Sequence, residues 1–118
     1  MIATLVQFRL GRAITIDEAR EAFSATAPKY QAVPGLLRKH YLLSKDGETA
    51  GGLYLWQSQA DADRFYSDEW RGFIRERYQS EPMVVCFENP VVVDNEAGTI
   101  RADLPPRILR CIAEGPQT

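Results

Sequence analysis

The sequence predicts an α+β fold of the ferredoxin-like type, with the element order β-α-β-β-α-β and one antiparallel sheet. Three observations predict it: a strictly alternating first strand, two helical patterns with N-terminal capping residues, and a central hairpin with an Asp-Gly turn. In this arrangement four antiparallel strands carry two helices on one face. The 118 residues are enough for one such domain with a modest core.

The first part of the chain reads as a strand followed by a helix. Residues 2–10 alternate between apolar and polar, which predicts a strand with one buried face. Thr15 and Glu18 have the spacing of a capping box, and apolar residues then recur at helical spacing as far as Tyr30. Pro28 should kink this helix or separate its last turn, because proline lacks an N–H.

The next two strands are predicted to form a hairpin between residues 36 and 57. Its turn is Asp46-Gly47, where Gly47 supplies the positive φ that such a turn needs. The adjacent Gly51-Gly52 pair suggests either a β-bulge or the close approach of another group.

The second helical pattern begins after Ser58, a candidate N-cap, and could break at residue 67 with Asp68 capping its second piece. A last strand is expected from Met83 to Val93, with Pro90 at an edge or bulge position. We therefore expect a domain over residues 1–95.

Residues 96–118 are expected to form a C-terminal extension. The prolines at 105–106 and the glycine at 115 are typical of the start and the end of a short helix. Because the apolar residues between them need cover, we expect this helix to pack on a partner subunit.

Composition excludes several functional classes. The formal net charge of −2 argues against a nucleic-acid or anionic-membrane binder, and no apolar run approaches the roughly 20 residues of a membrane span. No basic region opens the chain, so we expect no signal peptide and a cytoplasmic protein. Cys86 and Cys111 are far apart and there is one histidine, so a metal site is not expected. We expect both thiols to be reduced, and Cys86 to be buried.

Apolar residues occupy both faces of the predicted sheet, whereas two helices cover one face only. The uncovered face would leave a large apolar patch in water. The sequence therefore predicts a homodimer that forms through the sheet.

Several of these stretches together resemble the YdhR-type family of proposed mono-oxygenases, over about residues 2–94. The residues that carry the resemblance are Val33-Pro34-Gly35-Leu36, Arg38-Lys39, Gly51-Gly52-Leu53-Tyr54-Leu55-Trp56, Phe65-Tyr66 and Trp70. The family belongs to the dimeric α+β barrel superfamily, alongside the antibiotic-biosynthesis mono-oxygenases.

The resemblance implies a dimeric α+β barrel, with the two sheets facing each other and a pocket between sheet and helices in each subunit. Related enzymes oxidise electron-rich polycyclic phenols with molecular oxygen and use neither metal nor flavin. The implied function is a cofactor-independent mono-oxygenase for a small aromatic or polycyclic phenolic substrate. Two alternatives stay open: a non-enzymatic dimer that binds a hydrophobic metabolite, and another enzyme class on this fold, such as an isomerase or a haem-degrading protein.

His40, Tyr54 and Trp56 are the candidate catalytic residues. His40 can exchange protons near neutral pH, and alternation places it on one face with Leu36 and Leu42. Tyr54 and Trp56 would supply a phenol, an indole N–H and flat surfaces for an aromatic ring. The candidate substrate-binding residues are aromatic side chains of the two helices: Tyr30, Tyr66, Trp70 and Phe73. For each of these residues the plainer interpretation is a core or sheet residue.

Overall fold

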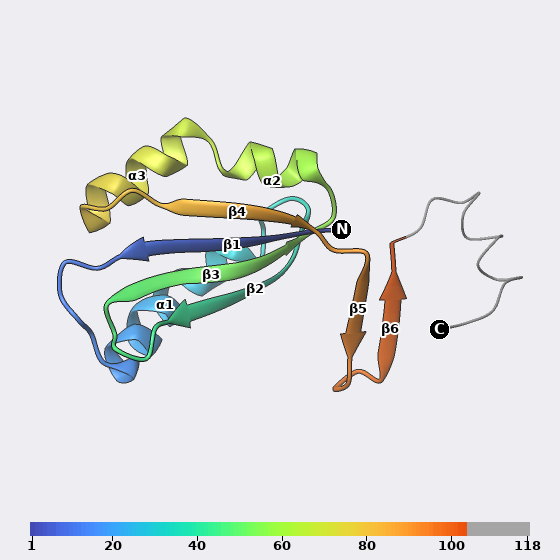
Figure 1. Cartoon of the computed structure of the whole chain (residues 1–118), viewed down its shortest axis with the longest axis horizontal. Coiled ribbons are helices and arrows are strands. Elements are labelled where there is room, and N and C mark those ends of the chain that lie inside the picture. Colours follow the sequence, from blue (N-terminus) through green and yellow to red (C-terminus); the bar gives the residue numbers. More distant parts are fainter. Residues whose placement is uncertain (104–118) are drawn as a thin grey trace, which may run out of the picture. The chain divides into compact units, whose positions relative to one another are not determined.

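Four antiparallel strands in the order β2-β3-β1-β4 form the main sheet (Figure 1). They are β1 (Ile2–Arg9), β2 (Leu36–Leu43), β3 (Thr49–Trp56) and β4 (Met83–Glu88). The structure is a computed structural model that describes residues 1–103. The chain divides into two units, Met1–Glu88 and a second one from Asn89 onward, and each is described by itself. The α+β fold with an antiparallel sheet is confirmed.

The first helix, α1 (Ile16–Tyr30), begins where its capping box predicts. The Glu18 backbone N–H donates to Thr15 Oγ1 at 3.1 Å, and the Thr15 N–H donates to Glu18 Oε1 at 3.0 Å. These two bonds satisfy N–H groups that have no partner within a helix. The helix continues through Pro28 to Tyr30, so the proline does not separate its last turn.

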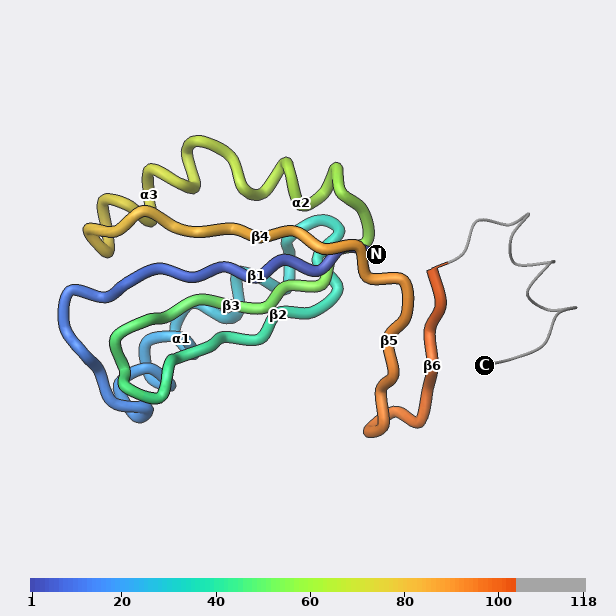
Figure 2. The backbone as a smooth tube through the Cα atoms, viewed as in Figure 1, coloured from blue at the N-terminus to red at the C-terminus, as the bar shows by residue number. Residues whose placement is uncertain are grey.

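The second helical pattern forms two helices, α2 (Gln59–Phe65) and α3 (Asp68–Tyr78), and Figure 2 follows the backbone from one into the other. Ser58 caps α2 as predicted. Ser67 caps α3 by accepting from the Trp70 N–H at 3.2 Å, so the expected cap at Asp68 is wrong by one residue.

The core lies on the face of the sheet that the helices cover. Its buried members are Ile2, Val6, Tyr54, Trp56 and Ala62. They come from alternate positions of β1 and β3 and from α2, as the period of two in a strand requires.

The other face of the sheet stays exposed and apolar. Leu53, Val85 and Phe87 keep 42%, 37% and 54% of their surface exposed. Cross-strand pairing places Leu53 and Val85 on either side of Leu5, which makes this face continuous over three strands. The predicted uncovered apolar face is therefore present in the chain.

A register shift in β2 changes the face of one residue. Leu36 pairs with Trp56, whereas Arg38 already pairs with Leu55, so β2 carries a bulge at this point. Leu36 consequently packs against the buried core. The prediction that Leu36 shares a face with His40 is wrong for this reason.

The last predicted strand is two strands. β4 ends at Glu88, and β5 (Val91–Asp94) pairs with β6 (Thr99–Ala102) in a separate two-stranded sheet. A single strand to Val93 is therefore wrong, because Asn89-Pro90 interrupts it and proline cannot donate to a ladder. The boundary expected at residue 95 lies in the turn between β5 and β6. The predicted helix from residue 105 lies outside the described residues.

The paired glycines of β3 reflect close approach. A Cβ on Gly51 would overlap the Val6 carbonyl group of the neighbouring strand. A Cβ on Gly52 would lie 2.9 Å from the Tyr54 ring and 3.4 Å from Lys39 Cε. The absence of a Cβ at Gly52 leaves room for the Lys39 side chain, which is part of the candidate site.

Candidate functional site

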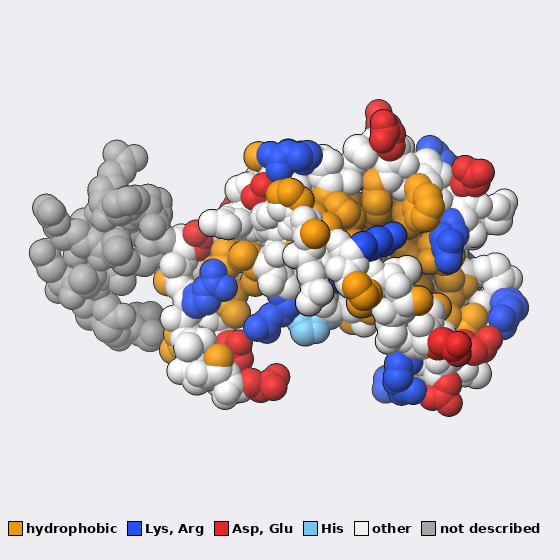
Figure 3. Space-filling model, turned by 180° about the vertical axis from the view of Figure 1, so that it is seen from behind, with side chains coloured by type: hydrophobic (Ala, Val, Ile, Leu, Met, Phe, Trp, Pro, Cys, Tyr) orange, Lys and Arg blue, Asp and Glu red, His pale blue; other side chains and the backbone are white. Residues whose placement is uncertain are grey.

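A cavity of about 120 Å³ lies between the sheet and the helices α1 and α3. The space-filling view from the helix side shows hydrophobic side chains gathered there, with lysine or arginine side chains among them (Figure 3). Its main lining residues are Tyr30, Lys39, Tyr41, Tyr54, Trp70 and Phe73. The site is therefore an aromatic chamber that contains an amine.

Lys39 is the polar centre of the cavity. Its Nζ lies 3.3 Å from the ring centroid of Tyr30, 3.8 Å from that of Tyr41 and 4.8 Å from that of Tyr54. Burial, and then the charge of nearby Lys29, lower the pKa of Lys39 to about 7. The three ring faces attract the ammonium form and so oppose this lowering. At neutral pH both the amine and the ammonium form of Lys39 are populated.

Tyr41 is held in place from α1. Its ring stacks on Phe23 with centroids 4.8 Å apart, and its hydroxyl is hydrogen-bonded to Thr26 at 2.7 Å. Burial raises the pKa of Tyr41 above its usual value, so the phenol stays neutral beside the amine.

Tyr54 and Tyr30 form a hydrogen-bonded pair of phenols in the same cavity. Tyr54 is buried at 4% exposure, and this burial raises its pKa far above the ordinary value of a phenol. The pKa of Tyr30 is also raised, again mainly by burial. Both side chains are therefore hydrogen-bonding groups that stay uncharged at neutral pH.

Trp56 and Tyr66 lie behind this chamber, in a buried polar network around Thr4. The Trp56 indole N–H donates to Thr4 Oγ1 at 3.1 Å, and the Tyr66 and Thr4 hydroxyls are hydrogen-bonded at 2.6 Å. Trp56 and Thr4 have no exposed surface, and Trp56 stacks parallel to Tyr54 at 5.9 Å. Neither Trp56 nor Tyr66 lines the cavity. Their contacts fix the position of Tyr54.

His40 lies on the opposite face of the sheet from the cavity. It pairs with Leu53 across the ladder and is exposed, whereas its neighbours Lys39 and Tyr41 point to the helices. Of the predicted site residues, the structure brings Tyr30, Tyr54, Trp70 and Phe73 together. It does not bring His40, Trp56 or Tyr66 to the cavity.

The family model "Putative mono-oxygenase ydhR" matches residues 5–81, which is more than half of the chain. The chain belongs to the YdhR family. The match begins inside β1 and includes β2, β3 and the helices α1 to α3, and therefore every described residue that lines the cavity.

Solved structures share the fold of this YdhR-family protein. A monooxygenase from the gene ActVA-Orf6 of Streptomyces coelicolor, in complex with nanaomycin D, aligns with a TM-score of 0.57 at 20% identity, over 79% of this chain and 90% of that one. SnoaB, a cofactor-independent oxygenase from Streptomyces nogalater, aligns with a TM-score of 0.54 at 16% identity, over 75% and 91% of the two chains.

A third structure, described as a putative antibiotic biosynthesis monooxygenase from Deinococcus radiodurans, has a TM-score of 0.58 at 8% identity, over 80% and 97% of the two chains. At these identities the likeness shows the fold alone. A comparison with curated proteins found no match.

Sequence reasoning missed Lys39 and Tyr41, which both line the cavity of this YdhR-family protein. The signal was available in the alternation of β2, because residues next to His40 must point to the other face. A lysine on the core side of a strand is unusual enough to mark a site, since lysines are rarely buried without a partner. Sequence reasoning favours histidine because of its ordinary pKa, whereas burial gives the neighbouring lysine a pKa in the same range.

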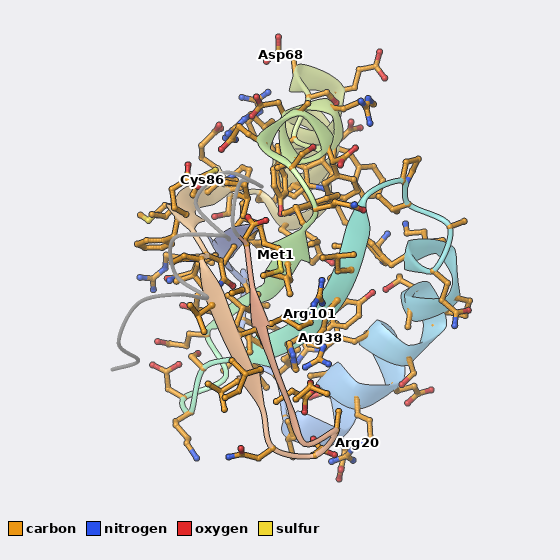
Figure 4. All side chains as sticks on the ribbon, turned by 90° about the vertical axis from the view of Figure 1, so that its right-hand side faces the viewer. Met1, Arg20, Arg38, Asp68, Cys86 and Arg101 are labelled. Atoms are coloured by element: carbon orange, nitrogen blue, oxygen red, sulfur yellow. The ribbon has the colours of Figure 1, made fainter. Side chains whose placement is uncertain are left out.

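Three further features of the described part of the YdhR-family chain concern metal binding, cysteine exposure and membrane spans. Residues 1–103 contain no cluster of three or more His, Cys, Asp or Glu side chains that could hold a metal ion. Cys86 is exposed on β4 rather than buried as expected, and it is labelled in Figure 4. None of the helices in this range is long and apolar enough to cross a membrane.

Proposed function

We propose that this protein is a cofactor-independent mono-oxygenase of a small phenolic aromatic compound, with Lys39 as the group that handles the phenol proton. The observation that carries the proposal is the Lys39 amine in an aromatic cavity, at a pKa of about 7. Membership of the YdhR family and the fold shared with a cofactor-independent oxygenase support the reaction class.

The proposed reaction needs no reductant besides its substrate. A phenol with a hydrogen at the para carbon reacts with O₂ to give the para-quinone and water. One oxygen atom becomes the new carbonyl group, and the other leaves as water with the two hydrogens of the phenol and the para carbon. The substrate therefore supplies all the electrons, and the protein has to bind it, ionise it and exclude bulk water.

Lys39 is suited to the ionisation step. Its neutral amine accepts the phenol proton, and the resulting ammonium group pairs with the phenolate, which is the electron-rich form that reacts with oxygen. Lys29 and Arg77 also line the cavity and add positive charge, whereas no Asp or Glu among residues 1–103 lines it. The field in the cavity therefore favours an anionic aromatic ligand.

The size of the cavity favours a small substrate. A dry protein cavity of about 150 Å³ accepts benzene, so the 120 Å³ present here corresponds to roughly one ring. Trp70 and Phe73 would contact that ring from α3, and Tyr30 and Tyr54 would hydrogen-bond its oxygen.

Oxygen uptake by metal-stripped protein, with a panel of single-ring phenols and with 1-naphthol and anthrone as larger comparison compounds, tests the proposal. We expect uptake above the buffer rate, one quinone per O₂ and no hydrogen peroxide. Lys39→Met should abolish the uptake, whereas His40→Ala should retain it. If Lys39→Met retains oxygen uptake and His40→Ala loses it, the role of Lys39 is refuted and the reaction takes place on the opposite face of the sheet.

The same experiment tests the main alternative, a non-enzymatic binding protein. The cavity serves that function equally well, because its aromatic walls bind a ring whether or not a reaction follows. No uptake across the panel, together with quenching of tryptophan fluorescence by the same compounds, would favour the binding protein.

We also propose that the open face of the sheet forms a homodimer interface. Leu53 lies at the centre of this face, opposite Leu5 on one side and His40 on the other. Leu53→Lys should shift sedimentation from dimer to monomer, because it places a charge in an apolar contact. Deletion of residues 99–118 should also weaken the dimer, and unchanged sedimentation of both variants would refute the interface.

A further inference from the structure

The Lys39 side chain is built into the cavity rather than folded away from it. Its stem passes over Gly52, where a Cβ would lie 3.4 Å from Lys39 Cε. Its amine lies among the rings of Tyr30, Tyr41 and Tyr54. The amine therefore borders a space of about one ring in size.

Burial and neighbouring positive charge oppose the protonation of the amine, against the attraction of the three ring faces. In the described part of the chain no carboxylate lines the cavity, and the charged side chains that line it beside Lys39 are Lys29 and Arg77, which are both cationic. The titratable phenols around it are those of Tyr30, Tyr41, Tyr54 and Tyr78. Removal from water and a nearby positive charge are the two conditions that turn a lysine into a nucleophile at neutral pH.

We propose that Lys39 is an amine nucleophile that binds aromatic aldehydes in this cavity as a covalent imine. The nitrogen lone pair attacks the carbonyl carbon and gives a carbinolamine. The carbonyl oxygen then leaves as water with the two hydrogens of the amine, and a carbon–nitrogen double bond replaces the carbon–oxygen double bond. No electrons are exchanged with another reagent, so the step needs neither oxygen nor a cofactor.

The walls of the cavity fit this ligand class. An aromatic aldehyde of one ring matches the volume, and the rings of Trp70 and Phe73 offer it flat surfaces. The hydrogen-bonded phenols of Tyr30 and Tyr54 lie beside the amine and can donate to the departing oxygen. Aliphatic aldehydes would form the same bond without these contacts.

The chain offers matched controls, because it contains three lysines in all. Lys29 also borders the cavity but is exposed, and Lys45 is exposed near the turn of the β2–β3 hairpin. An ordinary lysine is about 0.04% neutral at pH 7, whereas a pKa near 7 leaves about half of the amine neutral. Selective reaction at Lys39 is therefore the expected signature.

The test is reductive trapping of the full chain with benzaldehyde and cyanoborohydride at about pH 7 without oxygen, followed by peptide mass mapping. We expect Lys39 to be benzylated at least tenfold faster than Lys29 or Lys45. Lys39→Arg should lose this adduct and keep the circular dichroism of the parent. Lys29→Met should slow the labelling of Lys39 at pH 7, because it removes a neighbouring positive charge.

Equal labelling of the three lysines, preferential labelling of the N-terminal amine, or an unmodified Lys39 would each overturn the proposal. These results come from the parent chain, so a poorly folded variant does not affect them. Because trapping is done without oxygen, a failed oxygenation assay with selective trapping would overturn the proposed function alone.

Discussion

The amine of Lys39 on β2 lies 3.3 Å from the ring centroid of Tyr30, the last residue of α1. This contact joins the sheet to the end of the helix through a charged group that has lost much of its water. The ring face attracts the ammonium form, and burial opposes it. The protonation of one side chain is thereby linked to the packing of the domain.

This link predicts a pH-dependent stability. The folded pKa of Lys39 is about 7, whereas an unfolded lysine has a pKa of about 10.4. Between these values the unfolded chain binds the additional proton, so the free energy of unfolding should rise with pH through this window and fall as the pH approaches 7. Urea unfolding at several pH values, for the parent and Lys39→Met, measures the difference.

The comparison should stay below about pH 9.5. The buried tyrosines have raised pKa values in the folded protein, so the folded protein loses stability once the pH exceeds the ordinary tyrosine pKa of about 10. We expect the parent to gain stability relative to Lys39→Met as the pH rises. Parallel curves for the two proteins would mean that Lys39 titrates as an ordinary surface lysine.

A second prediction concerns the buried Thr4 hydroxyl. Thr4→Val keeps the shape of the side chain but leaves the Trp56 N–H and the Tyr66 hydroxyl without this partner. An unsatisfied buried polar group costs about 1–3 kcal/mol, so we expect a loss of about 2 kcal/mol or more. Thr26→Val is the control, since its partner Tyr41 is only half-buried. Equal losses in the two variants would show that burial of the network does not matter.

A third prediction concerns truncation of the stacked pair in β3. Tyr54 and Trp56 are 4% and 0% exposed, so replacing either with alanine should cost more than about 2 kcal/mol. Phe73→Ala should cost less, because 52% of the Phe73 surface is exposed. Chemical denaturation of the three variants measures the loss in the free energy of unfolding for each one. Near-neutral effects at Tyr54 and Trp56 would contradict their burial.

Interactions between residues close in the sequence made the starts of helices α1 and α2 predictable. The capping pair Thr15 and Glu18 fixes the start of α1 through two hydrogen bonds within four residues, so its signal is local. Ser58 acts in the same way at α2. The bulge before Arg38 depends instead on pairing with a strand that is distant in sequence, so no local pattern predicts that Leu36 faces the core.

The site was harder to predict because its chemistry depends on burial. His40 lies on β2 as the sequence predicts, but its neighbour Lys39 faces the helices and acquires the shifted pKa. That shift arises from burial and then from the charge of Lys29, and only the tertiary structure supplies both. The break at Pro90 was similarly ambiguous, since proline is compatible with both an edge strand and a strand end.

The last prediction compares two glycines with opposite roles. Gly52→Ala should destabilise the domain and disturb the cavity, because its Cβ would lie 2.9 Å from the Tyr54 ring and 3.1 Å from the His40 carbonyl oxygen. Gly72 lies inside α3, and a Cβ there would meet only the end of the Arg75 side chain at 3.8 Å. Gly72→Ala should therefore stabilise the chain by about 0.5–1 kcal/mol through helix propensity.

Thermal unfolding of both variants measures whether each substitution lowers or raises the melting temperature. The rate of Lys39 labelling reports on the cavity. We expect Gly52→Ala to lower the melting temperature and to change that rate, because the Lys39 stem must move away from the new methyl group. Gly72→Ala should raise the melting temperature and leave the rate unchanged. A Gly52→Ala protein as stable as its parent, with the same labelling rate, would show that Lys39 does not depend on the space above Gly52.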